Sequence, residues 1–540
     1  MESQGKSLAA QGHVEKGIAG AAGIVAFGTL ISRILGFIRD MILANLFGAT
    51  IAADAFYVAF RIPNILRELF AEGSMSAAFI PVFTEYLSKK SRSEAKELAS
   101  AAFTTLLLLL CIVVAFGIFF SPQLIRLIAP GFVDDPHKFS LTVSMTRIMF
   151  PFLLFISLAA LAMGILNSTR RFAPPALASG VFNVVSILFV FGFTPLLPEP
   201  VYGAAVGVAL GGLAQFLIQV PALYQEGFPL SFRRPIRPLH PGVVQMGRLL
   251  LPTTLGLSVT QINVLVNTLL ASYLVAGSVT YLYFGMRLIH FPLGIFAVAL
   301  STAILPTLSA QAAKGETEGL RQTFSFGLRL VFFITFPAMM GLILFRIPIV
   351  HLLFEHGEFG RVATLGTANA VLFYSIGLWA FAGIRIVVPV FYSLQDTKTP
   401  VKIGLVAVVA NVILNLILMG PLQHGGLALA TSLSAILNFS LLLLILRKRI
   451  GRIDGKRILN SHLKVLLASS TLLPISLWLN AQEMWLSSGS LLLKAALLAI
   501  AIAVSAASYF LIQASLKSEE MYFILNLIKS RFKKRSQTPH

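Results

Sequence analysis

Long apolar segments alternate with short polar loops along almost the whole chain. A helix of about 20 apolar residues is long enough to cross the hydrocarbon core of a bilayer. The runs 101–120 and 491–512 approach or reach that length. The pattern predicts fourteen membrane-spanning helices: 18–46, 54–87, 98–120, 140–166, 174–195, 202–223, 241–271, 277–309, 323–345, 363–393, 400–419, 425–446, 461–480 and 491–513. We therefore expect an all-α polytopic membrane protein.

The composition supports this class. Soluble domains contain about 25% charged residues, whereas this chain is 12% charged and 56% hydrophobic. Of its 42 Lys and Arg residues, 26 lie in the segments 88–97, 170–171, 233–237, 314–321, 398–402, 447–464 and 517–535. The intervening loops, near 47–53, 121–139, 194–202, 271–279, 345–362, 419–426 and 479–490, contain four.

This uneven distribution of Lys and Arg is typical of the positive-inside rule. We expect the basic loops and, because the number of spans is even, both termini to be cytoplasmic. The net charge of +20 then reflects contact with anionic lipid and not nucleic-acid binding. In the sixth span, Gly203, Gly207 and Gly211 form two overlapping GxxxG motifs, which predict a close contact with another helix.

An internal repeat occurs at a shift of about 225 residues. SMSAAFIPVF (74–83) corresponds to LSTAILPTL (300–308), and ILNS (165–168) corresponds to VFYS (390–393). The repeat predicts two six-helix lobes with the same orientation, followed by two appended spans. The predicted domains are a cytoplasmic tail 1–17, an N-lobe 18–228, a C-lobe 229–450, the appended pair 451–515 and a basic cytoplasmic tail 516–540.

Charged residues recur inside the first two predicted spans. Asp54, Arg61 and Glu68 are seven residues apart and share one helix face, which Glu72 extends. The remaining charged residues of interest are Arg67 in the second span, Arg33, Arg39 and Asp40 in the first, and Arg287 and Arg385 in the second half. An arginine at the centre of a bilayer costs about 3 kcal/mol, and such residues usually face a water-filled interior. We therefore expect a central cavity.

Mutual pairing accounts for Asp54, Arg61, Glu68 and Glu72, and for Asp40 beside an arginine. It does not account for the whole set, because the arginines outnumber the deeply placed acids. Guanidinium groups bind phosphate bidentately, so the surplus predicts a phosphate-bearing anion as the ligand. The candidate binding residues are Arg33, Arg39, Arg67 and Arg287.

The stretch GTLISRILGFIRDMILANLFGATIAADAFYVAFRIPNILRELFAEGSMSAAFIPVF begins at Gly28 and covers the first two spans. It closely resembles the start of the MurJ (MviN) lipid II flippases, a family of the MOP exporter superfamily. FGMRLIHFPLGIFAVALSTAILPTLS and SLQDTKTPVKI are similar to segments in the second half of that family. The resemblance covers spans one to twelve in order, with an extra pair following.

The resemblance implies a flippase that moves lipid II (undecaprenyl-pyrophosphate-linked disaccharide-pentapeptide) from the cytoplasmic to the periplasmic leaflet of a bacterial inner membrane. It implies alternating access around a cationic central cavity, a groove for the polyprenyl tail between spans thirteen and fourteen, and cell-wall synthesis proteins as partners. The family's essential arginines correspond to Arg33, Arg39, Arg67 and Arg287, and its important aspartate to Asp54. Some relatives carry acids where this chain has Met286 and His290.

The sequence contains no GxxxxGK[ST] phosphate loop. We therefore do not expect the chain to hydrolyse ATP itself. A monovalent cation is the only cofactor that the sequence suggests. Asn411 and Asn415 lie one turn apart, and Asn267 and Thr431 occur in other spans. The resemblance implies a sodium site at these positions, since some family members hold sodium at matching positions with carboxylates among the ligands. The alternative is that these side chains only form hydrogen bonds between helices.

Two rival functions remain at the level of sequence. Another exporter of the same superfamily, for a drug or a different lipid-linked glycan, would share the fold. The arginine constellation and the motif of the first span argue against it. An enzyme acting on polyprenyl phosphates would need positioned carboxylates with a metal, or a nucleophile, and the chain shows no such set. We therefore expect a transporter.

Overall fold

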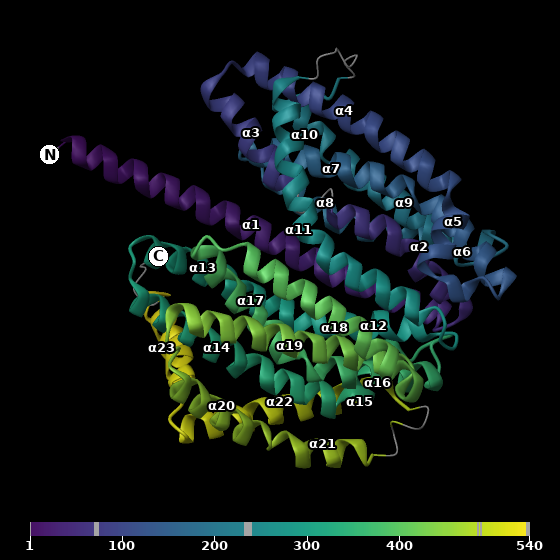
Figure 1. The fold of residues 1–540 in the computed structure, drawn as a ribbon, viewed down its shortest axis with the longest axis vertical. Helices are drawn as coiled ribbons and strands as arrows, with labels where there is room; N and C mark the ends of the chain where they lie inside the picture. Colours follow the sequence, from purple (N-terminus) through teal and green to yellow (C-terminus); the bar gives the residue numbers. More distant parts are fainter. Residues whose placement is uncertain (1, 70–74, 232–239, 483–484, 486–488, 536–540) are drawn as a thin grey trace. The chain divides into compact units, whose positions relative to one another are not determined.

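The computed structural model describes residues 2–69, 75–231, 240–482, 485 and 489–535. Within these residues the chain forms helices and no strands, which confirms the all-α prediction. The chain divides into two compact units, residues 1–276 and 277–540. Each unit is a bundle of helices (Figure 1).

Among the described residues of the first unit there are eleven α-helices and two short 3-10 helices. The α-helices are α1 (Glu2–Phe47), α2 (Ile51–Arg67), α3 (Met75–Lys89), α4 (Arg92–Phe119), α5 (Ser121–Ile128), α6 (Pro136–Met149), α7 (Pro151–Ser168), α8 (Ala173–Phe193), α9 (Tyr202–Leu217), α10 (Val220–Gln225) and α11 (Pro241–Ala271). The 3-10 helices are Pro130–Phe132 and Thr194–Leu196.

In the part of the second unit that the structure describes, there are twelve α-helices and one π-helical turn, Leu293–Ala297. The α-helices are α12 (Ser278–Pro292), α13 (Val298–Ala313), α14 (Thr317–Leu344), α15 (Arg346–Phe354), α16 (Arg361–Ile376), α17 (Leu378–Ser393), α18 (Lys398–Leu422), α19 (His424–Ile450), α20 (Gly455–Ser469), α21 (Leu472–Asn480), α22 (Leu491–Ser515) and α23 (Glu519–Arg535).

Each predicted span coincides with one helix or with two consecutive helices. Among the described residues, ten helices are long and apolar enough to cross a membrane, or up to eleven if α16 and α17, which meet at a 42° bend, form one span. The predicted spans outside this set are the first (α1), the second (α2 and α3) and the seventh (α11). The number fourteen therefore stays a prediction.

Helices α8 and α9 make the close contact that the GxxxG motifs predict. A Cβ atom on Gly207 would lie 2.8 Å from the backbone oxygen of Ser186, and one on Gly211 would lie 2.6 Å from the Ser186 hydroxyl oxygen. Only glycine leaves room for this approach at both positions. The prediction of a tight helix–helix contact is confirmed.

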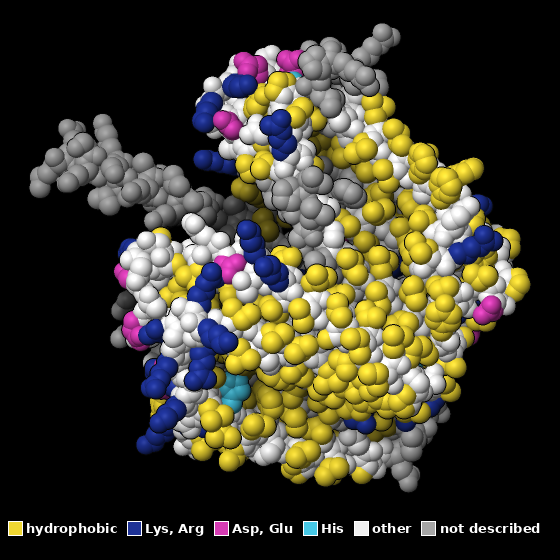
Figure 2. All heavy atoms as spheres, in the orientation of Figure 1, with side chains coloured by type: hydrophobic (Ala, Val, Ile, Leu, Met, Phe, Trp, Pro, Cys, Tyr) yellow, Lys and Arg dark blue, Asp and Glu magenta, His cyan; other side chains and the backbone are white. Residues whose placement is uncertain are grey.

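The surface of the protein is suited to lipid. Figure 2 shows hydrophobic side chains over most of the visible surface, with Lys and Arg side chains gathered in separate patches. Large apolar side chains are strongly exposed, including Leu492 (81%), Phe119 (72%) and Leu511 (70%). Exposed apolar surface on this scale indicates contact with a membrane. The protein is a multi-pass membrane protein.

Helix α11 packs against α3, α4 and α5 and belongs to the first compact unit. The predicted lobe boundary at 228/229 would place this helix in the second lobe. That boundary, like those at 450/451 and 515/516, stays a prediction.

The helices that follow α19 pack onto α14 and α15 of the second unit. The Tyr509 hydroxyl of α22 donates a hydrogen bond to the backbone oxygen of Phe333 at 2.7 Å. Asn480, at the end of α21, donates its side-chain amide to the backbone oxygen of Leu344 at 3.0 Å. The appended pair is therefore fixed to α14 by hydrogen bonds at two levels.

A group of four charged residues, which we call the C-terminal clasp, joins α14, α20 and α23. It consists of Arg329, Arg457, Glu519 and Glu520. Nη1 of Arg329 lies 2.9 Å from Oε2 of Glu519 and also contacts Glu520, while Nη2 of Arg457 lies 2.7 Å from Oε2 of Glu519. The side chains of Arg329 and Glu520 are only 6% and 3% exposed, so the clasp places a charge pair inside the helical packing.

Candidate functional site

The charged residues of α1 form a local pair against α8. Nη2 of Arg39 lies 2.9 Å from Oδ1 of Asp40, whose side chain is fully buried. The guanidinium carbon of Arg39 also lies 5.5 Å from the ring centre of Phe182, a cation–π distance. The predicted pairing of Asp40 with an arginine is confirmed. Arg33, six residues before Arg39 on the same helix, is exposed.

Asp54 near the start of α2 is paired with a lysine from another helix. Nζ of Lys138, in the first turn of α6, lies 3.3 Å from Oδ2 of Asp54. Both side chains are buried, at 1% exposure for Asp54 and 8% for Lys138. The lysine ammonium also lies 3.9 Å from the ring centre of Phe132. The carboxylate of Asp54 therefore has a counter-charge that does not come from the predicted arginine set.

Lys138 did not stand out in the sequence. It lies 84 residues from Asp54, at the end of a loop that the charge pattern places on the other side of the membrane from the basic loops. The only signal was a lysine beside the start of an apolar helix, opposite a buried acid in a neighbouring span. Nothing in the spacing indicated that the two helices are neighbours.

At the end of α2, Glu68 and Arg67 belong to a hydrogen-bonded network. The side-chain amide of Gln261 in α11 donates to Oε2 of Glu68 at 2.7 Å, and that of Asn64 donates to Oε1 at 3.2 Å. Nε of Arg67 donates to Oδ1 of Asn64 at 3.1 Å, and its Nη2 lies 3.7 Å from Oε1 of Glu68. Arg61, nearly two turns before Arg67 on the same helix, is half-buried. Glu72 lies outside the described residues.

The remaining candidate arginines belong to the second unit. Arg287 is half-buried on α12, and Arg385 is exposed on α17. The predicted anion-binding set therefore draws Arg33, Arg39 and Arg67 from one unit and Arg287 from the other. Their convergence on one ligand stays a prediction.

Three of the four residues of the suggested cation site lie together in the second unit. The side-chain amide of Asn415 donates to Oδ1 of Asn411 at 2.8 Å, and that of Asn411 donates to the hydroxyl of Thr431 at 3.5 Å. Thr431 in turn donates to the backbone oxygen of Leu427 at 2.9 Å. All three side chains are buried. This arrangement also suits the alternative role, a contact between α18 and α19.

Asn267, the fourth residue of that suggestion, lies on α11 in the first unit. Within the described part of the chain, no group of three or more His, Cys, Asp and Glu side chains is placed to hold a metal ion. The side-chain oxygens that Asn411, Asn415 and Thr431 could offer as ligands are uncharged. Uncharged oxygen ligands fit a weakly held monovalent cation better than a divalent one.

The motif SLQDTKTPVKI contains the turn between α17 and α18 and closes the start of α18. Asp396 accepts hydrogen bonds from the backbone N–H groups of Lys398 and Thr399 at 3.1 and 3.0 Å, and from the Thr399 hydroxyl at 2.6 Å. The bonds from Thr399 and the contact with Arg449 lower the pKa of Asp396 to about 2. The motif therefore caps α18 and joins its start to the end of α19.

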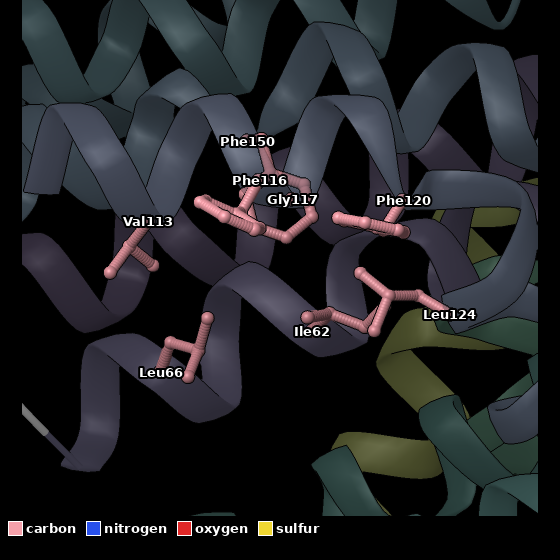
Figure 3. A pocket seen from close by; sticks show the side chains of 8 residues that line it. All are labelled: Ile62, Leu66, Val113, Phe116, Gly117, Phe120, Leu124 and Phe150. Atoms are coloured by element: carbon pink, nitrogen blue, oxygen red, sulfur yellow. The ribbon is translucent and has the colours of Figure 1, made fainter.

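An apolar groove of about 410 Å³ opens beside α2 (Figure 3). It is lined by Ile62, Leu66, Val113, Phe116, Gly117, Phe120, Leu124 and Phe150. Gly117 is required at its floor, because a Cβ atom there would lie 2.0 Å from the ring of Phe150. Helix α2, which carries Asp54 and Arg67, thus also presents the apolar side chains of Ile62 and Leu66 to this groove.

Comparisons with known proteins agree on one family. A family model described as "Lipid II flippase MurJ" matches residues 43–499. A probable lipid II flippase MurJ from Vibrio cholerae is 41% identical over 430 residues, which cover 78% of this chain and 81% of that protein. The lipid II flippase MurJ from Burkholderia cenocepacia is 38% identical over 423 residues, covering 78% and 82%.

Solved structures give the same result for the fold. A lipid II flippase MurJ in an inward closed conformation matches with a TM-score of 0.75 and 26% identity, over 91% of this chain and 99% of that chain. An inward-facing multidrug resistance MATE family transporter of the MOP superfamily matches with a TM-score of 0.67 over 81% of this chain and 99% of that one. Its identity of 15% supports a shared fold only.

Proposed function

The chain belongs to the lipid II flippase MurJ family, and we propose a role for each part of its candidate site in the flippase reaction. The protein functions as a lipid II flippase in peptidoglycan synthesis. In the proposed mechanism, lipid II enters from the cytoplasmic leaflet of the bacterial inner membrane and leaves into the outer leaflet. Both termini are on the cytoplasmic side, and the two lobes alternate access to the site.

Arg33, Arg39, Arg67 and Arg287 bind the pyrophosphate of lipid II in this proposal. The observation that supports it is the pairing of Asp54 with Lys138. Because the charge of Lys138 balances that of Asp54, the four arginines between residues 28 and 72 outnumber the three remaining acids, Asp40, Glu68 and Glu72. Guanidinium groups pair with phosphate oxygens through two parallel hydrogen bonds, so this excess suits a pyrophosphate.

Asp54 itself has a different role. Asp54 corresponds to the family's important aspartate, and the resemblance therefore places it among the substrate-binding residues. Its side chain is only 1% exposed and contacts Lys138, which favours a positioning role. We propose that the Asp54–Lys138 pair holds the start of α2 on α6, so that Arg61, Arg67 and Glu68 keep their places along the same helix.

The proposed site includes two further parts. The helices α20, α21 and α22 form the groove for the polyprenyl tail, and a monovalent cation bound at Asn267, Asn411, Asn415 and Thr431 is a candidate coupling ion. Cell-wall synthesis proteins are the proposed partners.

A pyrophosphate held by arginines from both lobes favours the loaded conformation, since a ligand shifts a conformational equilibrium only through differential contacts.

The test of this mechanism is Arg287→Ala. Removing one side of a charged clamp should cost roughly 2–5 kcal/mol of binding free energy, so transport should fail. The protein should stay inserted and abundant, because loss of a positive charge does not hinder membrane insertion. Complementation of a flippase-depleted bacterium, with detection of lipid II in each leaflet, measures the effect.

Two matched variants define the result. Arg287→Lys should restore transport only in part, since an ammonium group cannot reproduce the two-pronged guanidinium contact. Arg385→Ala removes an exposed arginine of the same unit and should have a milder effect. Full complementation by Arg287→Ala at normal abundance would refute the proposed pyrophosphate clamp.

A further inference from the structure

A buried chain of polar contacts joins α22 to α15. Nζ of Lys494, in the first turn of α22, lies 2.8 Å from Nε2 of His351. On the other side of the imidazole ring, Nδ1 lies 2.8 Å from Oε2 of Glu355. The exposed fractions of Lys494 and His351 are only 3% and 7%. None of these residues belongs to the proposed pyrophosphate or cation sites.

The surroundings of the histidine are mostly apolar. The ring of Trp485 lies edge-on to it, with ring centres 5.8 Å apart, and Phe345, Leu479 and Leu498 complete a buried cluster next to α15 and α22. In such surroundings an electrostatic interaction is stronger than in water. The charges at the two ring nitrogens therefore decide which contacts the histidine can make.

Glu355 is held within its own segment. Nη1 of Arg361, at the start of α16, lies 3.5 Å from Oε2 of Glu355 and donates a hydrogen bond to the backbone oxygen of Trp485 at 3.0 Å. Burial raises the pKa of Glu355, but contacts with Thr364 and His351 and the charge of Arg361 lower it by more, so the net pKa is lowered. The carboxylate thus remains ionised where an ordinary histidine, with a pKa of about 6.5, titrates.

The contact between Lys494 and His351 depends on the protonation state of the ring. A lysine ammonium group can only donate hydrogen bonds, so while Lys494 is charged, Nε2 of His351 accepts and carries no proton. The single proton of the neutral ring is then on Nδ1, next to the carboxylate of Glu355. Lys494 is therefore attached to the neutral form of His351 and not to the imidazolium form.

Protonation of His351 changes its partner. A second proton on Nε2 would place two donors, both positively charged, 2.8 Å apart. The imidazolium would still attract Glu355, which lies four residues further along the same segment. The contact that survives is thus the one within the α15 segment, and the contact that is lost is the one to α22.

We propose that His351 is a proton-binding site that controls the attachment of α22 to α15. Proton binding and lysine binding compete for the same nitrogen atom. By linkage, a fall in pH must then weaken the attachment. The charged groups around the ring are Lys494 on α22, Glu355 after α15 and Arg361 on α16, among the residues that the structure describes.

In the proposed topology this site faces the outside of the cell, so it would sense the external pH. Because α22 belongs to the proposed tail groove, acidification would loosen one wall of that groove. This last consequence rests on the proposed function. The attachment of α22 does not, and it can be measured without transport.

The experiment measures the distance between α16 and α22 in the full-length protein in nanodiscs. Spin labels at Val362 (77% exposed) and Leu492 (81% exposed), in a Cys111→Ser background, report that distance by pulsed electron resonance. Spectra are compared at about pH 8 and about pH 5, the two ends of the range in which imidazole side chains change charge in proteins. We expect a narrow distribution at the higher pH and a broader, longer one at the lower pH.

His351→Gln should remove this response, because the glutamine carbonyl can accept from Lys494 but cannot bind a proton in this range. Its distribution should stay narrow at both pH values. His356→Gln is the matched control: His356 follows the same helix and contacts the backbone oxygen of Leu352 at 3.1 Å. This variant should respond to pH as the unmutated protein does.

Lys494→Met provides a second route if His351→Gln accumulates poorly. It removes the competing cation and should also abolish the pH response. The proposal is overturned if the unmutated protein shows the same distribution at both pH values, or if His351→Gln keeps the response. A transport defect in Arg287→Ala has no bearing on this distance, so failure of the proton site and failure of the pyrophosphate site are distinguishable.

Discussion

Two buried polar clusters join neighbouring helices, one in each compact unit, and they use different chemistry. In the first unit, Asp54 and Lys138 join α2 to α6 through opposite charges 3.3 Å apart. In the second unit, Asn411 of α18 donates a neutral hydrogen bond to Thr431 of α19, and Asn415 donates to Asn411 within α18. Both clusters lie in helices that the proposed mechanism requires to keep their places.

The difference predicts how each cluster tolerates change. A buried charge needs its partner, since removing one member leaves an uncompensated charge in a low-dielectric interior. A neutral amide that loses its partner costs much less, because hydrogen bonds between helices in a membrane are worth about 0.6 kcal/mol on average. The charged cluster specifies its geometry strictly, whereas the neutral cluster permits some repacking.

The largest expected effect is that of Lys138→Met. It leaves the carboxylate of Asp54 buried without this cation, so the free energy of unfolding should fall by about 3–5 kcal/mol. A lower melting temperature of the purified protein and reduced abundance in the membrane would measure the loss. Lys138→Arg, which keeps the charge, should be milder.

The double variant Asp54→Asn with Lys138→Met is the control for this charge effect. It removes both charges and should recover most of the lost stability, since a buried ion pair is often replaceable by uncharged groups. If the double variant is as unstable as Lys138→Met, the charges are not the reason for the loss. The contrast between the two clusters would then disappear.

An intermediate effect is expected for Asn415→Ala. It removes the amide that donates to Asn411 within α18, and the loss of stability should be about 0.5–1.5 kcal/mol, the net contribution of a typical intramolecular hydrogen bond. The loss should be nearly equal in sodium and in potassium, because no carboxylate supplies charge for a tightly held cation. Melting temperatures in the two salts provide the measurement.

A bound sodium ion would produce a different pattern. The unmutated protein would then gain stability with sodium concentration by linkage, and Asn415→Ala would not. A large gain of this kind would establish the cation site and would make the second cluster a binding site instead of a packing contact.

The smallest effect should come from Thr431→Val. Its hydroxyl receives a long hydrogen bond of 3.5 Å from Asn411 and donates to the backbone oxygen of Leu427 in its own helix. The loss of stability should therefore stay near the average of about 0.6 kcal/mol. A change as large as that of Lys138→Met would mean that the neutral cluster is as strictly specified as the charged one.

The sequence predicted those contacts that depend on spacing along one helix. Asn411 and Asn415 are one turn apart, and Arg39 and Asp40 are adjacent, so both groups could be identified before the structure. The class of fold could be predicted too, because apolar length and the placement of Lys and Arg follow from the bilayer itself.

Contacts between distant segments could not be predicted in this way. Asp54 and Lys138 are 84 residues apart, and Glu68 and Gln261 are 193 residues apart. Their pairing depends on which helices become neighbours, which periodicity within one helix does not reveal. A lone charge in an apolar span, such as Arg329, indicates that a partner exists but not where it lies.

The C-terminal clasp has a consequence for the order in which the protein is made. The acidic partners of Arg329 follow it by 190 and 191 residues, so a ribosome adding about 5–20 residues per second needs roughly 10–40 s to reach them. During that interval the clasp cannot form, because Glu519 and Glu520, the acidic partners of Arg329 in α14, have not yet been made. A chain released before Glu519 permanently lacks these partners, so translation must continue past Glu520 before the ninth predicted span has its final partners.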